Sequence, residues 1–105
     1  KLLAAERVFR EFYRQFPEDF RSNFNLGIVL TELDKLNEGI SYLETSLLID
    51  PCVKEVYHSL SNAYIKDKNP QLALKMCLKV SLSNNYCPNE KINYYLIFHL
   101  VLIFI

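Results

Sequence analysis

The sequence predicts an all-α fold built from antiparallel helical hairpins that stack on one another. Hydrophobic residues make up 50% of the 105-residue chain, which is enough to bury the core of one small domain. Only two glycines and four prolines are present, so there is little material for the tight turns of an all-β fold. A 34-residue period then indicates that hairpins repeat along the chain, with about five to six helices in all.

The 34-residue interval recurs in residues of several kinds. It separates the small residues Ala5, Gly39 and Ala73, and it separates Pro17 from Pro51. The same interval joins four further pairs, namely Leu26 with Leu60, Gly27 with Ser61, Leu30 with Tyr64 and Phe9 with Leu43. Chance matches between apolar residues do not explain small residues, prolines and apolar residues that all repeat in phase.

Hydrophobic spacing places the elements in order. We expect helices near residues 1–15, 20–33, 38–49, 53–66 and 70–82, and from residue 89 onward. Leu26, Gly27 and Leu30 share one face of the second helix, and Gly39 and Leu43 share one face of the third. A small residue on each of two helices lets their backbones approach closely enough for larger neighbours to interlock.

The expected turns carry residues that suit helix ends. Asn37 follows a polar stretch and is expected to cap the helix after it. One period later Asn69 can cap the next helix, and Pro70 suits the first helical position because its missing N–H costs nothing there. Pro51 is expected to end one hairpin before the next begins.

Residues 20–53 closely resemble a tetratricopeptide repeat. The Leu-Gly pair of that family is present as Leu26-Gly27, its small residue in the second helix as Gly39, and its closing proline as Pro51. Asn23 stands where the family usually has an aromatic residue, and Phe24 beside it is expected to compensate in part.

The resemblance extends to both sides of this repeat. Residues 54–87 are similar to a second repeat, although Asn85 stands in the place of the closing proline. Residues 1–19 resemble the second helix of a partial repeat, and residues 88–105 correspond to a degenerate or truncated further helix. We therefore expect one α-solenoid domain over residues 1–105, within a longer repeat array.

The resemblance implies a function in binding. Tetratricopeptide repeats are non-catalytic protein–protein interaction modules of scaffolds and adaptors, and the first helix of each hairpin lines a concave groove. This groove would hold a peptide or helix of a partner protein. The groove residues expected by resemblance are Arg21, Phe24, Asn25 and Ile28 in the first full repeat, and His58, Ser59, Asn62, Ile65 and Lys66 in the second. Phe24 and Ile28 could instead pack in the core, because both lie one turn from core-type neighbours.

Residue types that carry catalysis are not arranged in a recognisable motif. The sequence holds no G-x-S-x-G, no glycine-rich phosphate loop and no His-Glu-x-x-His, and His58 and His99 have no spacing that suggests zinc. Acidic residues such as Asp19 and Glu38 lie at helix starts, where they suit the helix dipole. We expect no enzyme activity, cofactor or metal, and the net charge of zero gives no reason to expect nucleic acid.

Three cysteines, Cys52, Cys77 and Cys87, occur without a C-x-x-C spacing. We expect free, reduced thiols, and a Cys77–Cys87 disulfide is the alternative. Free thiols favour an intracellular location, with the cytoplasm as the expected compartment.

Residues 94–105, with the sequence YYLIFHLVLIFI, form an unusually apolar run. Three interpretations are open: the first helix of a further repeat, the start of a membrane helix, or an aberrant end that does not belong to this fold. A spanning helix needs about 20 apolar residues, so a membrane-anchored adaptor is the alternative rather than the leading hypothesis. An exposed run of this kind would also favour self-association. A further alternative is the non-catalytic part of a larger enzyme.

Overall fold

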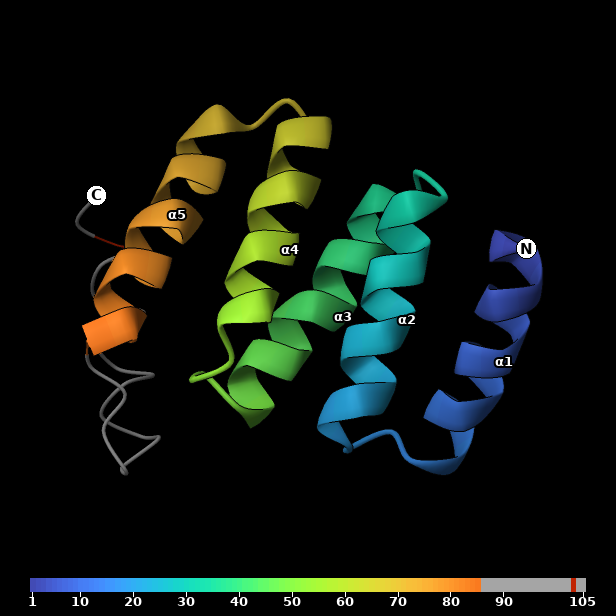
Figure 1. The fold of residues 1–105 in the computed structure, drawn as a ribbon. Helices are drawn as coiled ribbons and strands as arrows, with labels where there is room; N and C mark the ends of the chain where they lie inside the picture. The colour runs from blue at the N-terminus through green and yellow to red at the C-terminus, as the bar shows by residue number, and fades with distance from the viewer. Residues whose placement is uncertain (86–102, 104–105) are drawn as a thin grey trace. The chain divides into compact units, whose positions relative to one another are not determined.

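The computed structural model describes residues 1–85 and Ile103. This part of the chain holds five helices, namely α1 (Leu2–Gln15), α2 (Phe20–Glu32), α3 (Leu36–Ile49), α4 (Lys54–Lys66) and α5 (Pro70–Asn85) (Figure 1). The predicted all-α fold is confirmed, and each of these helices begins and ends within three residues of its expected limits. The helix expected from residue 89 onward lies outside the described residues.

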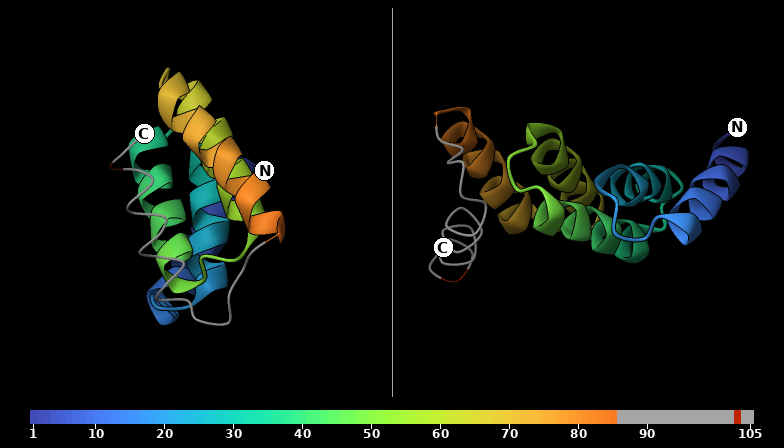
Figure 2. Two further views of the ribbon diagram at one scale, coloured as in Figure 1. Left: turned by 90° about the vertical axis from the view of Figure 1, so that its left-hand side faces the viewer. Right: turned by 90° about the horizontal axis from the view of Figure 1, so that it is seen from below.

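The chain divides into two compact units, residues 1–49 (unit 1) and residues 50–105 (unit 2). In unit 1, α2 packs against both α1 and α3. In unit 2, α4 packs against α5. Helices joined by a short turn run antiparallel, and Figure 2 shows each of these hairpins from two further directions.

The crossing of α2 and α3 in unit 1 is a close contact between two helices. A Cβ atom added to Gly39 would lie 2.6 Å from Thr31 Cγ2 and 2.9 Å from the Thr31 backbone nitrogen. A Cβ atom added to Gly27 would lie 2.8 Å from Leu43 Cγ. The two glycines therefore permit the backbone contact that the repeat spacing predicts.

Unit 2 makes the same crossing with slightly larger residues. Ser61 and Ala73 stand one period after Gly27 and Gly39, and both are buried. The Ser61 hydroxyl donates to the carbonyl oxygen of Ala73 at 3.3 Å, so the two helices meet at the corresponding point. The period therefore repeats a packing contact as well as a pattern of residue types.

Aromatic residues of α1 cover the apolar core of unit 1. Leu26, Val29 and Leu30 of α2 are buried, and half-buried residues of α1 and α3 pack against them. Among these, Tyr13 of α1 meets Tyr42 of α3 edge to face, with ring centroids 5.0 Å apart. Edge-to-face contact is a favoured geometry for two aromatic rings, and here it fixes α1 against α3.

Asn23 stands where the resemblance described above leads us to expect an aromatic residue. It is 1% exposed, and its Nδ2 donates to the carbonyl oxygens of Pro17 at 3.0 Å and Asp19 at 2.8 Å. One period later the Tyr57 hydroxyl donates to the carbonyl oxygen of Pro51 at 2.6 Å. The side chains of Asn23 and Tyr57 thus each donate to the carbonyl oxygen of the proline six residues earlier. The amide of Asn23, and not the neighbouring Phe24, makes the contact that the Tyr57 hydroxyl makes one period later.

The first helix of each hairpin ends in the same turn. Asp34 and Lys68, one period apart, have φ angles of 61° and 59°. The N–H of Lys35 donates to the carbonyl of Leu30, and the N–H of Asn69 donates to the carbonyl of Tyr64. These six-to-one bonds, each next to a left-handed residue, form Schellman motifs that satisfy the last carbonyls of α2 and α4.

The caps that follow these turns differ from each other. Asn69 precedes α5, and its Oδ1 accepts from the N–H of Leu72 at 3.3 Å, so the predicted cap is confirmed, as is Pro70 at the first helical position. The predicted cap at Asn37 is wrong, because α3 already begins at Leu36. The Schellman turn at Asp34 reverses the chain early, so α3 begins at Leu36, two residues before the expected start at residue 38.

Candidate partner-binding surface

One side of α2 in unit 1 is left open to solvent. Its N-terminus is fixed by Asp19, whose Oδ2 accepts from the N–H groups of Arg21 at 3.0 Å and Ser22 at 3.2 Å. The residues that turn toward the core are buried, among them Leu26 and Leu30. The open side carries exposed Arg21 and Glu32 with half-buried Phe24, Asn25 and Ile28.

Phe24 belongs to an aromatic pair on α2. Its ring stacks on Phe20, with centroids 5.5 Å apart and an angle of 22° between the ring planes. Both rings are half-buried, and Ile28 follows at the same four-residue spacing and is also half-buried. Phe20, Phe24 and Ile28 therefore form an apolar strip along α2 that unit 1 covers only in part.

The open side of α4 in unit 2 has a different character. His58, Asn62, Ile65 and Lys66 are exposed, with Ile65 at 60%, and Ser59 is half-buried. Apart from Ile65 these side chains are polar or charged. The nine residues expected to line a groove are thus divided between a partly apolar face on unit 1 and a mainly polar face on unit 2. Neither unit alone brings all nine together.

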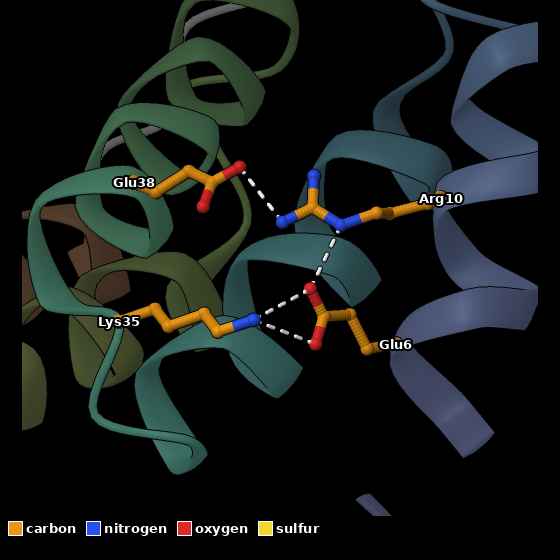
Figure 3. A network of polar contacts seen from close by, with 4 residues as sticks. All are labelled: Glu6, Arg10, Lys35 and Glu38. Carbon is orange, nitrogen blue, oxygen red and sulfur yellow. Dashed lines mark hydrogen bonds and ion pairs between the residues drawn. The ribbon is translucent and has the colours of Figure 1, made fainter. Parts of the chain in front are cut away.

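A cluster of ion pairs joins α1 to the turn before α3 and to α3 itself (Figure 3). Lys35 Nζ lies 3.0 Å from both carboxylate oxygens of Glu6, and Arg10 Nε lies 2.8 Å from Glu6 Oε2. The Arg10 guanidinium also reaches Glu38 Oε1 at 2.8 Å. Glu6 is only 8% exposed, so this carboxylate is almost enclosed by its two cations.

The cluster has the electrostatics of a structural contact. Hydrogen bonds from Lys35 and Arg10 lower the pKa of Glu6, and hydrogen bonds to Glu6 and Glu38 raise the pKa of Arg10. A carboxylate held ionised by two cations is poorly suited to accept and return a proton near neutral pH. We therefore assign Glu6 to the docking of α1, a role that the sequence patterns did not reveal.

The structure bears on two of the three cysteines. Cys77 is free and exposed, with its Sγ 3.2 Å from the Ser61 hydroxyl oxygen, so the alternative Cys77–Cys87 disulfide is wrong. Cys52, in the turn before α4, is disulfide-bonded, so the expectation that it is a free thiol is also wrong. Within residues 1–85, no cluster of histidine, cysteine and acidic residues could hold a metal ion.

The apolar run at residues 94–105 lies outside the described residues except for Ile103, which is helical and 71% exposed. Of the helices that the structure describes, none combines the length and the apolar character needed to cross a membrane.

Two comparisons with known proteins find a similarity. Residues 20–51 match the family model of the tetratricopeptide repeat. The fold is similar to a solved structure of a MamA mutant, with a TM-score of 0.73 and 20% sequence identity over 85% of this chain. The chain spans 49% of that structure. No curated protein sequence matches the chain.

Proposed function

We propose that this chain is a helical repeat protein of the tetratricopeptide type, because residues 20–51 match that family model, and that the open faces of α2 and α4 bind a segment of a partner protein. The observation that most directly supports this proposal is the half-buried strip of Phe20, Phe24 and Ile28 on α2. The two units would act together as consecutive repeats of one domain over residues 1–105.

The strip on α2 favours an apolar contact with the partner. Stacked rings that are already half-buried lose little side-chain freedom when a partner covers them, and they still have apolar area to remove from water. Aromatic residues are also enriched among those that carry most of the energy of protein interfaces. A partner side chain of aliphatic or aromatic type would fit this strip.

Polar groups beside the strip would set the position of the partner backbone. Asn25 is half-buried next to Phe24, and Asn62 is exposed on α4. An asparagine side chain offers two N–H donors and a carbonyl acceptor, so it can bond both the N–H and the C=O of an extended peptide. Asn25 and Asn62 would thus add polar contacts to the open faces of α2 and α4.

A library selection with matched variants tests this function. A random peptide library is selected against the chain, and the affinity of selected peptides is measured by fluorescence anisotropy. We expect the Phe24→Ala/Asn62→Ala variant to bind about tenfold more weakly or worse, a loss of about 1.4 kcal/mol. Leu48→Ala is the control, because Leu48 is a 55% exposed apolar residue on α3 and belongs to neither proposed face.

The outcome distinguishes binding at the proposed faces from non-specific binding of peptides to exposed apolar residues. Equal binding by wild type and Phe24→Ala/Asn62→Ala, or an equal loss with Leu48→Ala, would rule out these faces. The thermal unfolding of all variants, followed by circular dichroism, shows that each remains folded at the temperature of the assay.

A further inference from the structure

Cys52 is disulfide-bonded, and its bond needs a second sulfur atom. The chain has three cysteines, namely Cys52, Cys77 and Cys87. Cys77 is free, so Cys87 is the cysteine of the same chain that is left for Cys52. Cys87 lies outside the described residues, but its place in the sequence, two positions after the end of α5, relates it to the described helices.

The α4–α5 hairpin brings its two free ends to the same side. The helices pack against each other and are joined by the short turn of residues 67–69, so they run antiparallel (Figure 1). Cys52 stands two positions before the first residue of α4, and Cys87 stands two positions after the last residue of α5. The two cysteines therefore flank the same end of one hairpin.

The lengths of the two helices are compatible with a bond at this end. α5 has 16 residues and α4 has 13, so α5 extends about 4.5 Å further from the turn. The axes of packed helices lie about 8–10 Å apart, whereas a disulfide needs Cα atoms about 4.4–6.8 Å apart. Two extended residues span up to about 7 Å, so the two positions between each helix and its cysteine cover both differences.

The turn that carries Cys52 is fixed by buried contacts. Pro51 is buried, and its carbonyl oxygen accepts from the hydroxyl of the fully buried Tyr57 at 2.6 Å. The N–H of Cys52 donates to Asp50 Oδ1 at 3.2 Å, so the backbone of Cys52 is held as well. A cross-link from this turn would join the end of α5 to a rigid part of unit 2.

The end of α5 lacks the proline that closes the preceding repeat. Asn85 stands one period after Pro51 and is the last residue of α5. Proline cannot continue a helix and fixes its own φ angle, whereas asparagine does neither. A covalent bond two residues beyond Asn85 would hold the end of this hairpin where its sequence provides no such stop.

We infer that Cys87 bonds to Cys52, and that this disulfide is a redox-sensitive clasp on the α4–α5 hairpin. Formation of the clasp removes two protons and two electrons from the two thiols. Oxidised glutathione accepts them through a mixed disulfide and leaves as two thiol molecules. A dithiol such as dithiothreitol reverses the reaction and itself becomes a disulfide. The clasp goes beyond the proposed function, because it controls the stability of unit 2 and not the choice of a partner.

The clasp should stabilise unit 2 chiefly by restricting its unfolded state. It closes residues 52–87 into a loop, and a cross-link over a loop of this size is expected to raise Tm by about 10 °C or more. Both cysteines belong to unit 2. The helices of unit 1 should therefore respond little when the bond is reduced.

Peptide mapping tests the pairing. The full chain is equilibrated with a mixture of oxidised and reduced glutathione, unfolded, alkylated with iodoacetamide and digested with trypsin. Cleavage after lysine places each cysteine on a different peptide, namely residues 36–54, 76–79 and 80–91. We expect peptide 76–79 to be alkylated, and the other two peptides to be linked until dithiothreitol separates them. Alkylated Cys52, a link from Cys52 to peptide 76–79, or a disulfide between two chains would overturn the inference.

Matched variants test the role of the bond. Thermal unfolding of the full chain is followed by circular dichroism with and without dithiothreitol. Wild type and Cys77→Ser should both lose about 10 °C or more in Tm on reduction, whereas Cys52→Ser/Cys87→Ser should change by less than about 2 °C. An unchanged Tm of reduced wild type, or a response that disappears in Cys77→Ser, would overturn the clasp. These two proteins decide the question even if the double variant does not fold.

Hydrogen exchange locates the effect within the chain. On reduction, the amides of α5 should exchange about tenfold faster or more, whereas those of α2 should change less than about twofold. Equal acceleration in both helices would contradict a clasp that acts within unit 2. None of these measurements uses a bound peptide, so their outcomes are independent of the proposed function.

Discussion

Replacing Gly39 by alanine places a methyl group in the tightest contact between α2 and α3. The new Cβ would lie 2.6 Å from Thr31 Cγ2, 2.9 Å from the Thr31 backbone nitrogen and 3.0 Å from the carbonyl oxygen of Gly27. Relaxed contacts between such atoms need about 3.5 Å or more. The Thr31 methyl group can rotate away, but the two backbone atoms can yield only if the helices move apart.

Two opposing effects decide the change in the free energy of unfolding. Alanine is favoured over glycine inside a helix by about 1 kcal/mol. Overpacking of a close contact costs about 1–3 kcal/mol. We therefore expect Gly39→Ala to lack the gain that alanine gives elsewhere in α3 and to destabilise the chain by up to about 2 kcal/mol.

The helix-propensity effect can be measured on the same helix. Ser41 of α3 is exposed, so the difference between Ser41→Ala and Ser41→Gly reports the preference for alanine without the steric contact. Urea unfolding followed by far-UV circular dichroism gives the free energy of unfolding of the Gly39→Ala variant relative to wild type and that of Ser41→Ala relative to Ser41→Gly. Each kcal/mol corresponds to about 4–8 °C in Tm for a domain of this size. If Gly39→Ala raises the free energy of unfolding as much as alanine in place of glycine does at position 41, the close crossing is refuted.

Three further predictions concern turns, buried polar groups and charge. Lys68→Gly should raise the free energy of unfolding by about 1 kcal/mol, because glycine relieves a left-handed backbone. Asp34→Gly should raise it less, because aspartate tolerates that region better than lysine. Urea unfolding measures both values, and a loss of stability in either variant would contradict the strained turn. Tyr57→Phe should cost about 1–2 kcal/mol in the same assay, since the buried carbonyl of Pro51 loses its donor, and an unchanged midpoint would contradict this. The pKa of Glu6 is lowered from its ordinary value of 4.5, so its ion pairs stabilise the fold above that pH and are lost as the pH falls through the lowered pKa. The Tm of wild type should accordingly fall more steeply than that of Glu6→Gln below about pH 4.5, and parallel curves would exclude the contribution.

The parts of the fold that follow a period could be predicted from the sequence. Helix limits follow the apolar spacing, and the crossing at Gly27 and Gly39 was visible because only small residues fit where two backbones touch. The Schellman turns were not visible, because the left-handed positions hold Asp34 and Lys68 in place of the usual glycine. The turn at Asp34 also explains why the predicted cap at Asn37 was wrong.

The candidate surface could be predicted less completely than the fold. Repeat position identified the residues of α2 and α4 that turn away from the core, but it could not distinguish a core role from a surface role for Phe24. Stacking on Phe20, which places both rings between core and solvent, depends on the packing around them. The Glu6 cluster brings together residues 29 positions apart, and such pairings depend on how α1 docks, which no local pattern encodes.

The helices that pack most closely are α1 with α2, α2 with α3, and α4 with α5, each pair adjacent in the chain. Contacts between chain neighbours require the closure of only short loops, so little entropy is lost before the first contacts form. Proteins dominated by such local contacts fold within microseconds to milliseconds. Each hairpin is therefore expected to form early, during synthesis by the ribosome, before the helices that follow it have emerged.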